Sequence, residues 1–166
     1  MMEATQETIA VGLGEVHVTN NPSAKLACFG LGSCIAFSVY DSKAKVGGMA
    51  HIVLPDSNHT TPDKLSAKFA DVAIPLLLQK MSEYGASKSR LVIKIAGGAQ
   101  MFRLTGCNDT MNIGERNLAM VHKILVQEGL HLAAADTGGN GGRTMWLAVG
   151  SGKVTVRTLN REVNEL

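Results

Sequence analysis

Hydrophobic and polar residues alternate through the first part of the chain with the period of two that is typical of β-strands. The alternation predicts four strands, over residues 8–18, 25–31, 35–40 and 46–54. The links between them are short and rich in the turn-forming residues Asn, Asp, Ser and Pro. Short links usually join antiparallel neighbours, so we expect these strands to pair in that way.

The spacing of apolar residues changes to steps of three and four between Leu65 and Tyr84, which predicts an amphipathic helix. Asp63 stands where an N-cap is expected, and Gly85 follows as a C-terminal stop. Pro75 lies inside this segment and predicts a bend in the helix.

The second half of the chain mixes the two patterns. It contains a predicted buried strand, a second helix, a further strand and a hairpin, over residues 91–96, 113–129, 130–135, and 144–149 with 154–159. We therefore expect a single strand-rich α/β domain over residues 1–166, with two main helices packed on sheet faces.

Composition supports a folded core and argues against two classes of partner. Of the 166 residues, 45% are hydrophobic and 18% charged, which is enough apolar material for a sizeable core. The formal charge of +2 is too small to indicate nucleic-acid binding. The first residues do not resemble a secretory signal, and the longest apolar run, residues 72–78, falls far short of the roughly 20 residues of a membrane-spanning helix. We expect a cytoplasmic protein without membrane insertion, whose three cysteines are free thiols.

Cys34 and His51 are the residues whose surroundings best fit catalysis. A thiol with the ordinary pKa of about 8.5 is only about 3% thiolate at pH 7, so a nucleophilic cysteine needs a partner that lowers its pKa. His51 follows 17 positions later on a predicted strand, where it shares one face with Met49 and Val53. The alternative is that Cys34 is a small core residue and His51 a hydrogen-bonded core imidazole, and the register of the two strands decides between them.

The residues just before Cys34 suit the binding of an oxyanion. Gly30 and Gly32 allow a sharp turn that leaves the sulfur uncovered. The N–H groups of Ser33 and Cys34 can then point at one spot, where they would stabilise a developing negative charge. Gly32 and Ser33 are therefore the candidate substrate-binding residues.

No metal or cofactor is expected. The remaining histidines are scattered without a metal-binding spacing, and there is no Cys-x-x-Cys pair. The glycine-rich segments 12–14 and 139–144 lack the pattern of a dinucleotide fingerprint or a phosphate-binding loop.

Six short motifs occur in a fixed order between about Val11 and Arg157. They are GLGSC at 30–34, KVGGMAH at 45–51, LPD at 54–56, KIAGGAQMF at 94–102, NIGERN at 112–117 and DTGG at 136–139. Each motif alone is weak, but together and in register they resemble the CheD family of chemoreceptor glutamine deamidases.

The resemblance implies a cytoplasmic amidohydrolase that converts glutamine side chains of methyl-accepting chemotaxis receptors to glutamate. It also implies binding to a CheC-type phosphatase, and a fold similar to the catalytic domain of cytotoxic necrotizing factor. By position, the family nucleophile falls on Cys34 and its histidine on His51. The family's third site residue is a Thr six positions before the nucleophile, and here that position is Cys28. A thiol is a poor hydrogen-bond partner, so either Cys28 or a backbone carbonyl orients His51.

The chemistry of these residues agrees with that role. Attack by the Cys34 thiolate on a carboxamide, with a proton from His51 for the departing ammonia, would leave a thioester that water hydrolyses. A non-catalytic interaction module that binds receptor or phosphatase is the alternative, because Cys28 departs from the family pattern. Cys107 lies in a polar segment with no obvious base beside it and is expected to be incidental.

Overall fold

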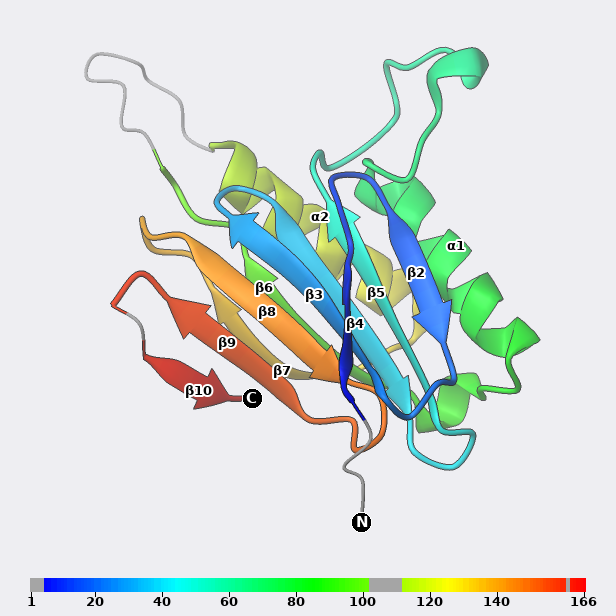
Figure 1. Cartoon of the computed structure of the whole chain (residues 1–166). Helices are drawn as coiled ribbons and strands as arrows, with labels where there is room; N and C mark the ends of the chain where they lie inside the picture. The colour runs from blue at the N-terminus through cyan, green and yellow to red at the C-terminus, as the bar shows by residue number, and fades with distance from the viewer. Residues whose placement is uncertain (1–4, 102–111, 161) are drawn as a thin grey trace.

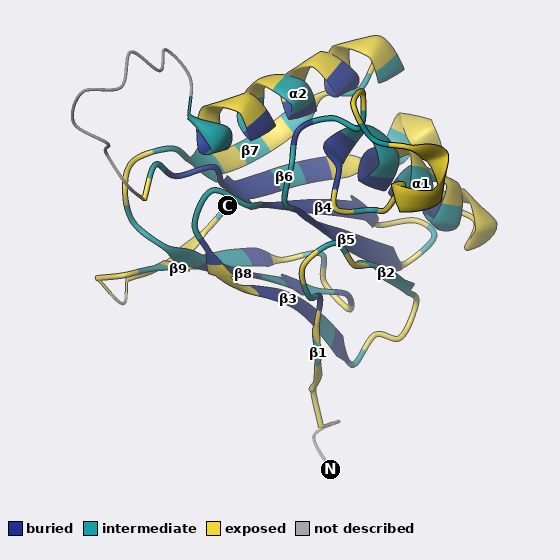
Figure 2. Ribbon diagram, turned by 90° about the horizontal axis from the view of Figure 1, so that it is seen from above, coloured by how far each residue is buried: buried dark blue, intermediate teal, exposed yellow. Residues whose placement is uncertain are grey.

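A computed structural model describes residues 5–101, 112–160 and 162–166. Two five-stranded sheets stack face to face, and both helices lie on the outer face of one of them (Figures 1 and 2). The strand-rich α/β class expected from the sequence is therefore confirmed. Cys107 lies outside the described residues.

The first sheet has no helix on its outer face in the described part of the chain. Its strand order is β1-β3-β8-β9-β10, and β1 is parallel to β3 while the other neighbours are antiparallel. The strands are β1 (Glu7–Ala10), β3 (Ala24–Leu31), β8 (Arg143–Ala148), β9 (Val154–Thr158) and β10 (Val163–Glu165).

The second sheet lies between the first sheet and the helices (Figure 2). Its order is β2-β5-β4-β6-β7, with β6 and β7 parallel and the other pairs antiparallel. The strands are β2 (Val16–Thr19), β5 (Val46–Ile52), β4 (Ile35–Asp41), β6 (Val92–Gly97) and β7 (Leu132–Thr137).

Helices α1 (Ala70–Glu83) and α2 (Ile113–Glu128) cover this second sheet. The Asn112 side chain caps α2 by accepting a hydrogen bond from the Glu115 N–H at 3.0 Å, and Gly129 ends the helix in the left-handed region. Single turns of 3₁₀ helix occur at Pro62–Lys64 and Lys88–Arg90.

Three details of the sequence prediction are wrong. Residues 8–18 do not form one strand: the chain breaks at Val11 and gives β1 and β2 in different sheets. Strands β3 and β4 follow each other closely but also belong to different sheets, so they are not antiparallel neighbours. Helix α1 begins at Ala70, and Asp63 lies in the preceding 3₁₀ turn instead of capping it.

The alternation of side chains in the second sheet builds two cores. Ile35, Phe37 and Ile52 face the helices, together with Ala50 and Ile95. The opposite face of the sheet packs against the first sheet and forms the inter-sheet core, which includes Leu26, Cys28, Leu31, Ala36, Met49, Met145 and Leu147. The candidate residues lie at one end of this inter-sheet core.

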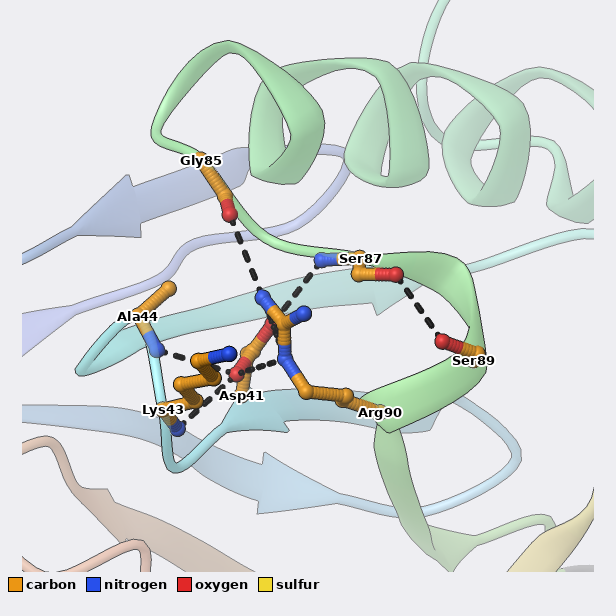
Figure 3. A network of polar contacts seen from close by, with 7 residues as sticks. All are labelled: Asp41, Lys43, Ala44, Gly85, Ser87, Ser89 and Arg90. Atoms are coloured by element: carbon orange, nitrogen blue, oxygen red, sulfur yellow. Dashed lines mark hydrogen bonds and ion pairs between the residues drawn. The ribbon is translucent and has the colours of Figure 1, made fainter.

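A buried carboxylate fastens the opposite end of β4. Asp41 is fully buried and accepts hydrogen bonds from the N–H groups of Lys43, Ala44 and Ser87 and from the Arg90 Nε (Figure 3). Burial alone would raise the pKa of this carboxyl, but the Arg90 guanidinium and the three N–H groups outweigh it and hold the pKa well below its usual range. The cluster ties the β4–β5 hairpin to the segment that follows α1.

Neither helix in the described ranges combines the length and hydropathy that a membrane span requires.

Candidate active site

Cys34 lies in the short connection between β3 and β4, where the chain passes from one sheet to the other. Three successive carbonyl groups of this connection accept hydrogen bonds from more distant parts of the chain. The Gly32 carbonyl accepts from the Ala99 N–H at 2.9 Å, and the Cys34 carbonyl accepts from the Gly98 N–H at 3.0 Å. The Ser33 carbonyl accepts from the side-chain amide of Asn117 at 2.9 Å. The backbone beside the nucleophile candidate is therefore fixed on its carbonyl side.

Two N–H groups of this connection have no acceptor among the described residues. Among the described residues, the N–H groups of Ser33 and Cys34 donate no hydrogen bond within the chain. A trans peptide points its N–H away from its C=O, so fixing the two carbonyls also fixes the direction of these two donors. Gly32 and Ser33 are expected from the sequence to contact substrate. In the structure their carbonyls hold the turn, and Ser33 supplies one of the two N–H groups.

Gly97 is required for the approach of β6 to this connection. Its φ is +116°, and a Cβ at this position would overlap the carbonyl oxygen of Cys34. Only glycine combines this backbone angle with the close contact, which gives the first glycine of the KIAGGAQMF pair a structural reason.

His51 lies near the end of β5 and is 4% exposed. Its backbone N–H donates to the Glu15 carbonyl at 3.0 Å, and its carbonyl accepts from the Gly14 N–H at 2.9 Å. Its ring Nδ1 lies 2.9 Å from the Val11 carbonyl. A carbonyl can only accept, so Nδ1 carries the hydrogen and Nε2 has the lone pair in the neutral ring. Among the described residues Nε2 is buried without a hydrogen-bond partner.

The strand register places Cys34 and His51 on the same side of the second sheet. Ala36 pairs with His51, and both face the first sheet. Cys34 is two positions before Ala36, and it packs against the same inter-sheet core. The Cys34 side chain and the His51 ring therefore lie against the same core, near the start of β4 and the end of β5. The register on which the sequence hypothesis depends is the favourable one.

Cys28 is fully buried on β3 and also faces the inter-sheet core. Burial raises the pKa of the Cys28 thiol far above its ordinary value, and the neighbouring Cys34 and Glu15 raise it further. The hydrogen bond that fixes the ring of His51 goes to the Val11 carbonyl and not to Cys28. Of the two alternatives for the orienting group, the structure places the backbone carbonyl at Nδ1. A backbone carbonyl leaves no side-chain signal, so sequence reasoning could not have named Val11.

Burial also raises the pKa of the Cys34 thiol. From the sequence, an imidazolium at His51 is expected to lower this pKa. The structure gives the opposite direction because desolvation of the thiolate dominates. The resting side chain is therefore a thiol, and it must lose its proton when it attacks.

Asn117 is a residue of the site that sequence reasoning missed. It is fully buried on α2, and its Nδ2 donates to the Ser33 carbonyl at 2.9 Å and to the Val53 carbonyl at 3.0 Å. The signal was present in the sequence, because Asn117 takes a core position of α2 in register with Val121 and Ile124. A polar residue at such a position needs hydrogen-bond partners.

No cluster of metal ligands accompanies the pair. In residues 5–101, 112–160 and 162–166, no three His, Cys, Asp or Glu side chains converge in a way that could hold a metal ion. The fold and site define a two-sheet α/β protein with a cysteine and a histidine at the ends of adjacent strands.

Comparison with known proteins identifies the family. The chain belongs to the CheD family: residues 53–158 match the family model described as CheD chemotactic sensory transduction. A relative from Clostridium novyi, named probable chemoreceptor glutamine deamidase CheD, is 44% identical over 97% of this chain and 99% of its own length. One of the same name from Symbiobacterium thermophilum is 42% identical over 95% of this chain and 96% of its own. The family resemblance of the six motifs is confirmed.

Two solved structures show a distant likeness. The hypothetical protein YfiH of Bacillus licheniformis has a TM-score of 0.47 and 14% identity, over 74% of this chain and 49% of that chain. A DUF152 protein of Neisseria meningitidis has a TM-score of 0.42 and 11% identity, over 75% of this chain and 52% of that chain.

Proposed function

We propose that this chain is a cytoplasmic chemoreceptor glutamine deamidase in which Cys34 is the nucleophile and His51 the general acid and base. Membership of the CheD family supports the reaction. The observation that supports the site is that Cys34 packs against the inter-sheet core toward which the ring of His51 also points. Among the described residues, His51 Nε2 and the N–H groups of Ser33 and Cys34 have no hydrogen-bond partner.

The reaction begins with a proton transfer. Because burial raises the pKa of Cys34, the thiol gives its proton to His51 Nε2 as the sulfur attacks the carboxamide carbon of a glutamine side chain. The Val11 carbonyl holds Nδ1–H and stabilises the imidazolium that forms. The C–S bond forms, and the carbonyl oxygen becomes an oxyanion.

The N–H groups of Ser33 and Cys34 stabilise this oxyanion. In well-studied enzymes, removal of one such donor costs about 2.7–4 kcal/mol of transition-state stabilisation. Collapse of the intermediate breaks the C–N bond, and the imidazolium of His51 protonates the nitrogen so that it leaves as ammonia. The product is a thioester on Cys34. Water, deprotonated by the neutral His51, hydrolyses the thioester to glutamate and restores the thiol.

Two finer parts of the proposal rest on the family resemblance. Binding to a CheC-type phosphatase stays a prediction, and so does the likeness of the fold to the catalytic domain of cytotoxic necrotizing factor.

The test is deamidation of a receptor cytoplasmic fragment, followed by mass mapping of Gln-to-Glu conversion and by ammonia release. We expect Cys34→Ala to abolish conversion. Cys28→Ala is the matched control, since it removes a buried thiol from the same core but leaves the Val11 bond to His51 intact, and it should retain kcat within about threefold. Deamidation by Cys34→Ala would refute the mechanism. Absence of conversion by the wild-type protein, with receptor or phosphatase binding preserved, would favour the interaction module.

A further inference from the structure

We propose that Asn117 is a positioning residue that aims the Cys34 N–H at the reacting oxygen and joins the nucleophile's turn to the strand that carries His51. The inference rests on the proposed function, because it assigns a role to Asn117 in that reaction. It comes from the two hydrogen bonds that one buried amide makes to two different strand ends.

The two acceptors of Asn117 belong to the two halves of the site. The Ser33 carbonyl directly precedes Cys34, and the Val53 carbonyl lies two residues after His51. Both hydrogens of Nδ2 are used, so their fixed angle sets the separation of the two carbonyls. A single amide thus couples the turn of the nucleophile to the end of β5.

The direction of the first bond decides what the coupling does. Helix α2 lies on the outer face of the second sheet (Figure 2). The ring of His51 faces the first sheet, where it meets the Val11 carbonyl. The Ser33 carbonyl points toward α2, where Asn117 holds it. The peptide between Ser33 and Cys34 is planar and trans, so its N–H points away from α2 and toward the side on which His51 lies. Asn117 therefore orients a donor that it does not touch.

The packing of α2 makes this orientation rigid. Gly114 lies so close to the Gly98–Ala99 backbone that a Cβ there would lie 2.5 Å from the Ala99 carbonyl oxygen. The same two residues hold the carbonyls of Cys34 and Gly32 through their N–H groups. The first turns of α2 and the segment after β6 thus form one support for the turn of Cys34.

A role confined to stability explains the arrangement less well. At a core position on the apolar face of α2, a buried amide costs desolvation that an apolar residue would avoid. Its Oδ1 is buried without a partner among the described residues, so the amide is not fully satisfied by the fold. An apolar side chain at this position could not fix the direction of the Ser33 and Val53 carbonyls, whereas the Asn117 amide does.

The experiment compares Asn117→Ala with Val121→Ala. Val121 lies one turn further along the same buried face of α2, so its truncation removes core packing without a bond to the site. We expect Asn117→Ala to lower kcat for deamidation of a receptor fragment about 100-fold, with KM within about threefold, because misdirection of a catalytic donor acts on the transition state. Val121→Ala should keep kcat within about threefold while it lowers stability.

Alkylation of Cys34 by iodoacetamide, mapped by mass spectrometry, is the second readout. This reaction forms no oxyanion, so its rate in Asn117→Ala should stay within about threefold of wild type. If Asn117→Ala does not fold, Asn117→Ser provides the test, since one hydroxyl can replace only one of the two bonds and kcat should fall about tenfold.

Two results would overturn the inference: kcat of the folded Asn117 variants equal to that of Val121→Ala, or a loss of alkylation in parallel with kcat. Cys34→Ala in the same assay separates this failure from failure of the proposed function. If Cys34→Ala is inactive and the Asn117 variants are normal, only the role of Asn117 is wrong.

Discussion

Replacement of Asp41 by Asn tests how the buried carboxylate stabilises the fold. Oδ1 of Asp41 accepts from the Lys43 and Ala44 N–H groups at 3.0 Å each, and Oδ2 accepts from the Ser87 N–H at 2.8 Å. Arg90 contacts both oxygens. An amide keeps one acceptor oxygen and replaces the other with a donor. The NH₂ group of the new amide therefore faces N–H donors that the carboxylate oxygen accepted from, and the Arg90 guanidinium loses its counterion.

Loss of one partner of a buried ion pair costs about 3–5 kcal/mol. We expect the lower end, about 3 kcal/mol, because the Arg90 side chain is 35% exposed and water can solvate part of its charge. For a chain of 166 residues this corresponds to a fall in melting temperature of roughly 6–12 °C. The assay is urea denaturation followed by circular dichroism at pH 7.

Glu128→Gln is the matched control. Lys88 and Glu128 also approach to 2.9 Å, but their side chains are 55% and 36% exposed. An exposed pair contributes at most about 1 kcal/mol, so the control should change the free energy of unfolding much less than Asp41→Asn.

The pH dependence gives the sharper test. The folded-state pKa of Asp41 is held below its usual range, so its contribution is complete above the unfolded-state pKa of about 3.9 and is lost as the pH falls below that value. The Asn variant has no such carboxyl. The difference between wild type and variant should therefore shrink between pH 5 and the lowest pH at which the protein stays folded. A difference that is constant over this range, or smaller than that of Glu128→Gln at pH 7, would refute the reasoning.

Two further predictions concern the site. Gly97→Ala should lower the free energy of unfolding by at least about 3 kcal/mol, because its Cβ would overlap the Cys34 carbonyl at a φ that disfavours alanine. The control Gly85→Ala, with φ +87° and open space around the Cβ, should cost about 1 kcal/mol. Equal losses of stability in thermal melts would contradict the clash. The alkylation rate of Cys34 should still be rising at pH 8.5, since burial raises its pKa and keeps the thiolate fraction at pH 7 below about 3%. A rate that levels off by pH 7 would show that an imidazolium, and not burial, controls the thiol.

The sequence predicted the elements well wherever one face of an element is apolar. The ranges of β3, β4 and β5 differ from the expected ones by at most two residues at each end, and the second helix agrees to within one. Two errors lie where neighbouring strands change sheets, at residues 8–18 and between β3 and β4, and a third lies at the start of α1. Alternation reports which side chains are buried, but the same alternation fits a strand in either sheet. The short β10, with all three residues exposed, carries no burial pattern and was missed.

The sequence by itself determined the family through its six motifs, the α/β class, and Cys34 and His51 as the candidate pair. These features are written in side chains and their spacing. Only the tertiary structure decided how the pair is supported: the Val11 carbonyl at His51 Nδ1, the N–H groups of Ser33 and Cys34 that have no acceptor in the described part of the chain, and Asn117 behind the Ser33 carbonyl. It also reversed the expected direction of the Cys34 pKa. The physical reason is the same in each case. Every residue has a carbonyl and every residue but proline an N–H, and only the packing of distant segments decides which of them are hydrogen-bonded and how far a thiol is desolvated.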